Sequence, residues 1–583
     1  MITGNNDRIL SNIALARENI AKSANAKTVV MVTSTDEDRA RWQKRLEDTS
    51  PYIFNRDGGT FVLSLREKIG GKLRTGNFLG TLLAYSRLKE VAAASGKDIR
   101  DTVSLMGMIL GRGERISPFT QIEGNSKPAI ISSAPRIPEI KKRILVTEVE
   151  EALMYFSPVA KYLEKGGFRG VLNKWGDETQ IPSIDISEDP DKDSFSYDII
   201  KFVSVVKMTD ELAEQKDWVV FDGDDNIVAQ LSRNKKSVLI KELKQYEGRG
   251  TKDEGQRMSG VSPAFAKATA GKRPTSHVPR PTSHGISLGP VAVSYDFLDI
   301  ALEVFDNDIK KEGVSLDFDP YLIAAFAVDG DIEKWDDLLR SDPAMRFVAG
   351  PKGMIPDLFE KAGKIKDVFK EKKGRDLRMK VIDLGEGIFW ADIGQHKAMR
   401  EKYLALADDG PTGTVTREIE RVPHVRDNNG NIIVDSHIGP SVDIKDSVVI
   451  GSTVNSGKIR KSVIKESVLG EVDMNGAFAV LCYRAGRTIL KTGSGIYRSL
   501  GKAAETLVLD KGMRHGTFIS HAGHFDMKVS EDTDLRDRKK NYETPVFGNK
   551  LSFRDAYEMM AGVSERELEE LRRSYIDEIK HSK

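Results

Sequence analysis

The residues best suited to chemistry follow one apolar run, Leu105–Leu110, whose composition predicts a buried strand. Gly111 and Gly113 come directly after it, Arg115 stands two residues further on, and Lys127 follows a Pro-Phe-Thr turn. Glycine lacks a Cβ atom, so the backbone N–H groups of such a turn approach phosphate oxygens closely. Arginine and lysine add positive charge beside them. The pattern therefore predicts a site for a triphosphate.

Two aspartates lie at the ends of predicted strands. Asp177 follows Val171–Trp175 and one glycine, and Asp392 lies within the segment Phe389–Gln395. Ligands of open α/β sheets bind at the edge formed by the carboxyl ends of the strands. This position favours Asp177 as a functional residue, with Glu178 as a weaker candidate. An aspartate that only caps a turn is the alternative reading at both positions.

The order of these features resembles the signature loop of the sugar-1-phosphate nucleotidyltransferases, also called nucleotide-sugar pyrophosphorylases. The apolar strand, the G-x-G pair, the arginine, the Pro-Phe-Thr turn and a Lys-Pro pair at Lys127 occur in the order typical of that family. The segment Trp390–Gln395 is similar to the family's Trp-x-Asp-Ile-Gly-Thr. Gly80 and Thr81, with Ala84, resemble a family turn that lies over the nucleotide base.

The resemblance implies an enzyme that makes a nucleotide sugar and pyrophosphate from a nucleoside triphosphate and a sugar 1-phosphate. It implies that Arg115 and Lys127 hold the phosphates, and that Asp177 and Asp392 are catalytic and bind Mg²⁺. It also implies nucleotide contacts from five residues, which are Leu110, Gly111, Gly113, Gly80 and Thr81. Because Mg²⁺ keeps phosphates and water in its shell, one or two protein carboxylates suffice.

Two departures from the family pattern leave other functions open. The family usually has glycine where Leu110 stands and threonine where Glu114 stands. A leucine would crowd the base, and a glutamate adds negative charge beside phosphates. A regulatory or assembly subunit with a pyrophosphorylase-like domain and no turnover is therefore an alternative. A transferase with another phosphorylated acceptor is a further one, and Arg233 or Lys235 is the candidate contact for the acceptor phosphate.

The elements that must position these residues alternate between strands and helices. The first part of the chain is predicted to form a helix at 7–24, a strand at 28–33, a helix from 37, a strand at 61–65 and a helix from about 76. Alternation of this kind is typical of a parallel α/β sheet. We expect a Rossmann-like mixed-sheet nucleotidyltransferase domain over residues 1–420. Since the signature normally lies near the N-terminus, its position here indicates a circularly permuted core or an N-terminal extension.

The second half of this domain contains a predicted hairpin and a predicted insertion. Asp222 and Gly223 separate the alternating segments 218–221 and 227–231, which is a strong hairpin signal. Residues 247–287 are rich in Gly, Pro, Ser, Thr and Lys and repeat the pentapeptide Arg-Pro-Thr-Ser-His. Such a segment has too few apolar side chains to pack, so we predict that it is a disordered insertion.

From residue 432 onward, apolar residues recur every six positions. Ile432, Ile438, Ile444 and Ile450 show this period. Hexapeptide repetition is typical of a β-helix, and the repeat resembles the left-handed parallel β-helix appended to many nucleotidyltransferases. We predict this element over residues 430–480 and a C-terminal extension with a helical tail over residues 481–583. We expect the β-helix to mediate a homo-oligomer.

Two groups of histidines offer weaker alternatives. His437 lies in the repeat, where a histidine would suit an acyltransferase. His521, His524 and Asp526 follow one another at a spacing that would suit a transition metal. Histidines in such places are more often hydrogen-bonded loop residues.

Composition excludes several other classes. The chain has 583 residues, enough for about two to four domains, and a net charge of +1, which gives no overall attraction to nucleic acid or membrane. Its single cysteine, Cys482, excludes an intrachain disulfide and fits a reducing compartment. No apolar run reaches the roughly 18 residues of a membrane span, and the N-terminal residues lack a signal-peptide core. We expect a cytoplasmic protein without nucleic-acid or membrane partners.

Overall fold

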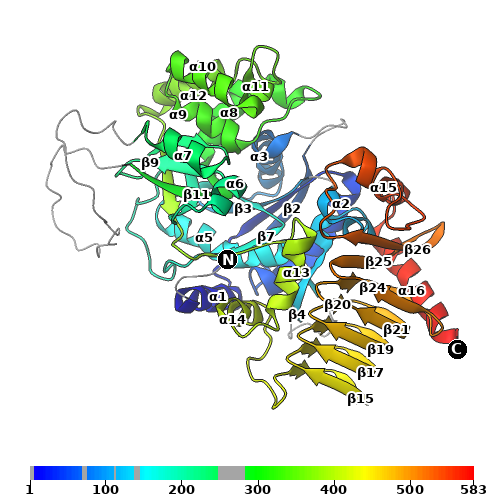
Figure 1. Ribbon diagram of the computed structural model, residues 1–583. Helices are drawn as coiled ribbons and strands as arrows, with labels where there is room; N and C mark the ends of the chain where they lie inside the picture. The colour runs from blue at the N-terminus through cyan, green and yellow to red at the C-terminus, as the bar shows by residue number, and fades with distance from the viewer. Residues whose placement is uncertain (1–5, 68–74, 111–112, 137–144, 247–281, 583) are drawn as a thin grey trace.

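A computed structural model describes residues 6–67, 75–110, 113–136, 145–246 and 282–582 of the chain. Its centre is a mixed sheet of nine described strands (Figure 1). The path through this sheet is β10-β9-β11-β6-β3-β1-β2, and β8 joins β12 to β11. The bounds are β1 (Thr28–Thr33), β2 (Phe61–Arg66), β3 (Val103–Ile109), β6 (Gly170–Trp175), β8 (Ile199–Ser204), β9 (Trp218–Phe221), β10 (Ile227–Leu231), β11 (Ser283–Ser294) and β12 (Met379–Asp383).

Pairing of the first strands confirms the predicted α/β class. β1 is parallel to both β2 and β3, and β3 is parallel to β6. β11 is antiparallel to β6, β8 and β9, which makes the sheet mixed. The strand predicted at residues 28–33 lies in the same sheet as the signature strand, with Thr28 opposite Ser104. This placement meets the condition that a circularly permuted core requires.

Helices cover both faces of the sheet, which explains why β1 and β3 are buried throughout. Side chains alternate across a strand. Val29 and Met31 therefore pack with one set of helices, and Val30 and Val32 pack with the other. The first set includes α1 (Asn6–Ala21) and α5 (Glu148–Lys165), and the second includes α3 (Gly76–Ala94) and α8 (Tyr295–Lys310).

The predicted insertion is too long at its C-terminal end. Residues 247–281 lie outside the described part of the chain, but β11 begins at Ser283. His284 stands opposite Val220, and its ring centroid lies 5.6 Å from that of Trp218. Pairing with β9 and β8 orders the segment 283–287, because it satisfies backbone groups that local composition does not reveal.

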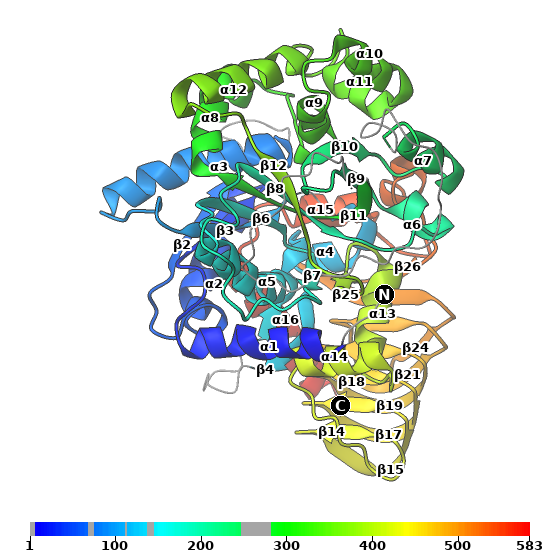
Figure 2. The same cartoon turned by 90° about the vertical axis from the view of Figure 1, so that its left-hand side faces the viewer.

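The C-terminal part of the chain is rich in strands, which alternate between two parallel sheets (Figures 1 and 2). One sheet comprises β14 (Ile432–Val434), β16 (Val448–Ile450), β18 (Val463–Lys465), β20 (Phe478–Val480) and β22 (Gly495–Tyr497). The other comprises β15 (His437–Lys445), β17 (Thr453–Arg460), β19 (Val468–Asn475), β21 (Tyr483–Leu490), β23 (Leu500–Gly501) and β24 (Thr506–Leu509). We call these two sheets the strand stack.

From β16 to β22, the first sheet of the strand stack is buried on both faces. Val449 and Ile464 pack between the two sheets, whereas Val448 and Phe478 face the first part of the chain. The ring of Phe478 lies 5.0 Å from that of Tyr403 on α13 (His396–Ala405). The strand stack is therefore joined to the α/β part by an apolar interface.

The strand stack extends beyond the predicted boundary at residue 480. Parallel pairing continues through β21 and β22 to β25 (Met513–Ser520). The number of residues between paired positions increases here, since Phe478 pairs with Gly495, and this hides the repeat in the sequence. The chain then turns back as the antiparallel β26 (Gly523–Ser530), and a helical tail follows as predicted, with α15 (Phe553–Met559) and α16 (Glu565–His581).

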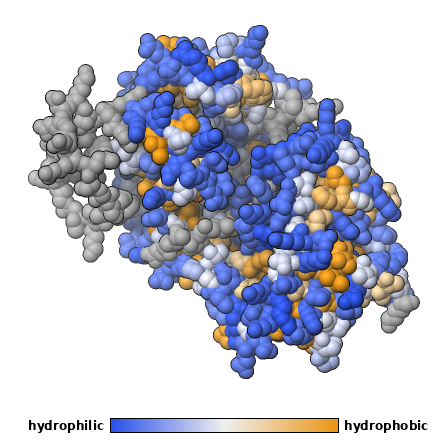
Figure 3. Space-filling model, in the orientation of Figure 1, coloured by the Kyte–Doolittle hydropathy of each residue, from blue (hydrophilic) through white to orange (hydrophobic). Residues whose placement is uncertain are grey.

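The described surface is mostly polar. Figure 3 shows apolar side chains scattered among hydrophilic ones, some of them over the strand stack. The exposed large apolar residues are Ile240, Ile332, Phe347, Val425, Ile433, Val508 and Phe547. They belong to separate elements and mark no single surface for self-association among the described residues. Within the same ranges, no helix combines the length and the apolar character that crossing a membrane requires.

Two glycines with the same backbone conformation provide a test of how closely neighbouring strands of the stack approach one another. Gly457 and Gly523 share φ of +121°, so an alanine is strained at either position. A Cβ on Gly457 would stand 1.8 Å from the Val472 carbonyl oxygen, whereas one on Gly523 meets nothing within 4 Å. We expect Gly457→Ala to lower the free energy of unfolding by about 1–3 kcal/mol more than Gly523→Ala does. Urea unfolding of both variants measures this, and equal losses would contradict the described packing.

Candidate functional site

Pairing between two distant segments brings three carboxylates together. β7 (Glu178–Ile181) follows β6 after a short turn and is antiparallel to β13 (Phe389–Asp392). Asp392 stands opposite Glu178, and the Ile393 N–H donates to the carbonyl oxygen of Asp177 at 3.1 Å. We call this pair of strands the carboxylate ribbon. It places the two predicted aspartates side by side, although more than two hundred residues separate them in the sequence.

The signature loop folds tightly next to this ribbon. Gly113 has φ of +61°, and a Cβ at this position would stand 2.7 Å from both the Lys127 Cβ and the Thr120 Oγ1. The Thr120 hydroxyl donates to the Gly113 carbonyl oxygen at 2.8 Å. A glycine at position 113 therefore lets the segment that carries Lys127 close onto the loop. Gly111 lies outside the described residues.

Two cations of the loop meet the two aspartates around Gly394. Lys127 Nζ forms an ion pair with the Asp177 carboxylate. The position of a Cβ on Gly394 lies 2.8 Å from Asp392 Oδ1 and 3.4 Å from both Arg115 Nη2 and Lys127 Nζ. The Gly394 N–H also donates to Asp392. The four residues predicted to be catalytic are thus brought into one cluster, with Arg115 exposed.

Electrostatics give Asp177 and Glu178, which are neighbours in the sequence, different protonation states. Burial opposes ionisation of Asp177, but Lys127, Lys174 and Arg115 outweigh it and lower the pKa of that carboxyl. Burial, with Asp392 and Asp177 nearby, raises the pKa of Glu178 to about 7, against the opposing effect of two lysines. Asp177 is therefore an anion at neutral pH, whereas Glu178 titrates there.

Two lysines complete the site, and sequence reasoning missed both. Lys174 Nζ donates to the carbonyl oxygens of Trp175 at 3.1 Å and Glu178 at 2.6 Å, and burial lowers the pKa of its ammonium. Lys216 Nζ lies 3.3 Å from the centroid of the Trp390 ring, and burial also lowers its pKa. A lysine inside the apolar run before Asp177 was a usable signal for Lys174, but nothing in the local sequence marked Lys216.

The predicted turn over the nucleotide base is wrong. Gly80 and Thr81 lie inside α3, where Thr81 Oγ1 donates to the Asn77 carbonyl oxygen at 2.6 Å and to Asn173 Oδ1 at 3.0 Å. Both are buried, so a base would reach them only if neighbouring side chains moved. The helical run continues through these residues because their apolar neighbours pack against β3. Leu110 is half-buried at the end of that strand.

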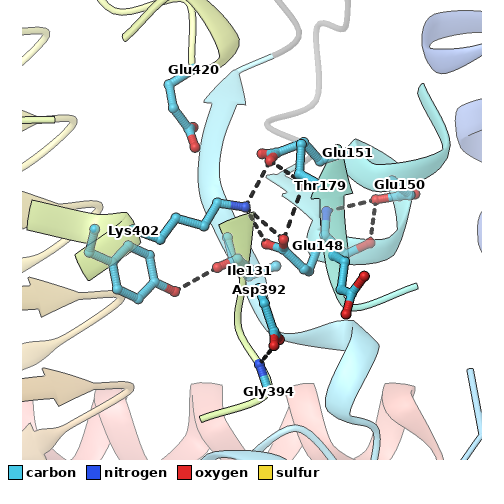
Figure 4. Close-up of polar contacts among 12 residues, drawn as sticks. Ile131, Glu148, Glu150, Glu151, Thr179, Asp392, Gly394, Lys402 and Glu420 are labelled. Atoms are coloured by element: carbon cyan, nitrogen blue, oxygen red, sulfur yellow. Dashed lines mark hydrogen bonds and ion pairs between the residues drawn. The ribbon is translucent and has the colours of Figure 1, made fainter. Parts of the chain in front are cut away.

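A buried charge network supports the carboxylate ribbon from behind (Figure 4). Lys402 Nζ lies 2.7 Å from both carboxylate oxygens of Glu148 and 2.7 Å from Glu151 Oε1. Thr179, in the middle of β7, donates to Glu151 at 2.7 Å. Lys402 lies on α13 and the two glutamates on the first turn of α5, so the network ties both helices to the ribbon.

The network holds more carboxyls than ammonium groups. Glu420 pairs with Lys465 of the strand stack at 3.5 Å and adds a third carboxyl near Lys402. Burial raises the pKa of Glu148 to about 8, although Lys402 opposes this and Glu151 adds to it. Three carboxyls and two lysines therefore balance when Glu148 retains its proton.

The other predicted site residues do not gather into a site. Arg233 lies 3.4 Å from Asp217 and is largely exposed. The His524 ring stacks on Tyr575, 3.9 Å away, and Asp526 instead lies 3.2 Å from His515. Across the described ranges, no three His, Cys, Asp or Glu side chains form a metal cage. His515 is thus paired with Asp526, and His524 is stacked on Tyr575.

Comparisons with known proteins add nothing to this geometry. No protein-family model matches the chain, and no curated protein matches it either. The functional argument therefore depends on the residues of the site.

The raised pKa of Glu148 predicts how stability changes with pH. The folded state keeps this proton up to about pH 8, whereas the unfolded chain loses it near the ordinary pKa of 4.5. Because the folded state binds more protons between these values, stability is fully present below about pH 4.5 and falls as pH rises toward 8. We expect Glu148→Gln to remove a fall on the order of 3 kcal/mol.

Urea unfolding at several pH values between 5 and about 8.5 measures this difference. The exposed Glu558 supplies the control, because Glu558→Gln should keep the slope of the parent protein. An unchanged slope in Glu148→Gln would show that this carboxyl is already ionised in the folded state.

Proposed function

We propose that the chain is a sugar-1-phosphate nucleotidyltransferase, which makes a nucleotide sugar and pyrophosphate from a nucleoside triphosphate and a sugar 1-phosphate. The single observation that carries the proposal is the convergence of Arg115 and Lys127 on Asp177 and Asp392 around Gly394. Two cations beside two carboxylates suit a substrate that brings several phosphate charges. Lys216 and the Trp390 ring, on the far side of Glu178, suit the acceptor.

The chain's own residues act by positioning and by neutralising charge. Arg115 is exposed and can meet the triphosphate, while Lys127 must exchange the Asp177 carboxylate for a phosphate oxygen. An oxygen of the sugar 1-phosphate attacks the α-phosphorus and forms the new P–O bond. The bond from the α-phosphorus to the bridging oxygen breaks, and pyrophosphate leaves with the electron pair. Because the attacking phosphate is already an anion, no side-chain base is needed.

The carboxylates fit the Mg²⁺ that such a reaction uses. Asp177 and Asp392 supply oxygen ligands at adjacent positions, and Glu178 stands opposite Asp392. Two carboxylates suffice where phosphates and water complete the shell. When bound there, Mg²⁺ would neutralise charge on the reacting phosphates.

The architecture suits the same proposal. The mixed sheet has the strand order of an open α/β core, which we interpret as a Rossmann-like nucleotidyltransferase domain with its first strands permuted. We interpret the strand stack as a left-handed parallel β-helix, because strands of two parallel sheets alternate along the chain. Association of two or more copies through this element remains part of the proposal.

A non-catalytic regulatory subunit is the second candidate, and one observation favours it. The ion pair between Lys127 and Asp177 occupies the lysine that a triphosphate needs and the aspartate that Mg²⁺ needs. A domain that keeps this pair closed would bind ligands without turnover. Retention of both Asp177 and Asp392 argues for the enzyme.

Pyrophosphate release identifies the reaction. We expect release with Mg²⁺ from one combination in a grid of five nucleoside triphosphates and several sugar 1-phosphates. Asp392→Asn should lower kcat by roughly a hundredfold, because it removes a charge that orders the reacting phosphates. The matched control is Asp337→Asn. Asp337 is exposed, lies far from the ribbon in sequence and pairs with Arg340. Release that persists in Asp392→Asn would refute the assigned site.

Thermal unfolding with Mg²⁺ and a nucleoside triphosphate separates the two candidates. Ligand that binds only the folded state should raise Tm by a few degrees, and Asp177→Asn should abolish this rise. A rise in Tm without pyrophosphate release from any sugar phosphate would favour a transferase with another phosphorylated acceptor. No rise with any nucleotide and no pyrophosphate release would favour the regulatory or assembly subunit, which needs no working nucleotide site.

A further inference from the structure

The signature loop is held by the C-terminal tail at its first residue. Arg538 lies in a short helical turn after the strand stack, and its Nη2 stands 3.2 Å from Glu114 Oε1. Glu114 directly precedes Arg115 and stands where the nucleotidyltransferase pattern has an uncharged residue. The tail thus places a positive charge beside the acidic side chain that precedes Arg115.

The tail also holds the far end of the same segment. Asn125 Nδ2 donates to the Tyr557 carbonyl oxygen at 2.7 Å. Arg572, on α16, donates to the Ile122 carbonyl oxygen and lies 3.4 Å from Glu123. The bond from Arg572 ends on a main-chain atom of the segment, and the bond to Tyr557 comes from the Asn125 side chain, so together they hold the far end of the segment.

Glu123 is the centre of the second contact. Its carboxylate is buried and accepts hydrogen bonds from Tyr497 and Arg498 of the strand stack. Arg498 in turn lies 3.6 Å from Glu569, which also pairs with Arg572. A buried carboxylate with one arginine from the stack and one from the tail joins three parts of the chain at the end of α4 (Phe119–Ile122).

We propose that the C-terminal segment from Arg538 to Ser582 is a positioning element for the phosphate-binding loop. It holds the backbone from Glu114 to Asn125 at both ends, and Arg538 cancels the charge that Glu114 would otherwise present beside Arg115. Arg538 and Arg572 are thus positioning residues that touch no substrate. The part of the proposal that concerns phosphate affinity depends on the proposed function, and the part that concerns the backbone does not.

A double-mutant cycle tests the charge. The probe is inorganic tripolyphosphate, which needs no base or sugar pocket, and its Kd is measured by titration calorimetry. We expect Arg538→Gln to weaken binding about fivefold, the effect of one partly exposed charge, and Glu114→Gln alone not to weaken it. The double variant Glu114→Gln/Arg538→Gln should regain the affinity of the parent protein. A loss that persists in the double variant, or no loss in Arg538→Gln, would overturn the charge role.

Hydrogen exchange tests the backbone without any ligand. We expect Arg572→Met to speed exchange of the amides between residues 114 and 125 by about tenfold, because it removes charge-assisted bonds to this segment. Arg566→Gln changes an exposed arginine of the same helix, which pairs with Glu570, and should change nothing there. Unaltered exchange in a folded Arg572→Met protein would overturn the proposal.

Calorimetry and hydrogen exchange test different parts of the proposal, so one can contradict it while the other supports it. If the parent protein binds neither tripolyphosphate nor any nucleoside triphosphate, the proposed function is refuted, while exchange still decides whether the tail holds the loop. If Arg572→Met does not fold, Asn125→Gly replaces it, since Asn125 has φ of +64° and glycine accepts that conformation. Faster exchange of residues 114–125 in Asn125→Gly supports the proposal, and unchanged exchange overturns it.

Discussion

The pairing of β7 with β13 is the constraint on which the rest of the site depends. Four residue pairs join a turn after β6 to a segment more than two hundred residues later. They put Asp177, Glu178 and Asp392 within one short ribbon, where like charges repel. That repulsion explains the lysines around the ribbon, Lys127 and Lys174 above all, and the second network with Lys402 behind it. These cations offset the repulsion among the three half-buried carboxyls.

The same balance links the α/β part to the strand stack. Lys465 and Arg498 come from the strand stack and pair with Glu420 and Glu123 of the first part. These ion pairs are buried, so each would leave an uncompensated charge if the parts separated. The strand stack is therefore more than an appended module, because it completes electrostatic networks whose other halves lie beside the site.

Glu114 illustrates how a departure from a family pattern is read differently once contacts are visible. In the sequence it is an acidic residue beside a phosphate-binding arginine, and it argues against catalysis. In the fold it is paired with Arg538 from the helical tail, so its charge is compensated. The ion pair of Lys127 with Asp177 argues instead for a regulatory subunit. A measurement of turnover distinguishes the enzyme from that subunit.

Local pattern determined much of this protein and failed where distant segments meet. The sequence alone determined β1, the hairpin of β9 and β10 and the helical tail, because periodicity and turn residues act within a few positions. It also predicted Arg115, Lys127, Asp177 and Asp392 as site residues, because their motifs lie next to the ends of predicted strands. Only the tertiary structure decided that Lys216 lies against Trp390, that Gly80 is buried inside α3 and that β11 begins at Ser283. Each of these depends on contacts with residues far away in the chain, and no local period records such contacts.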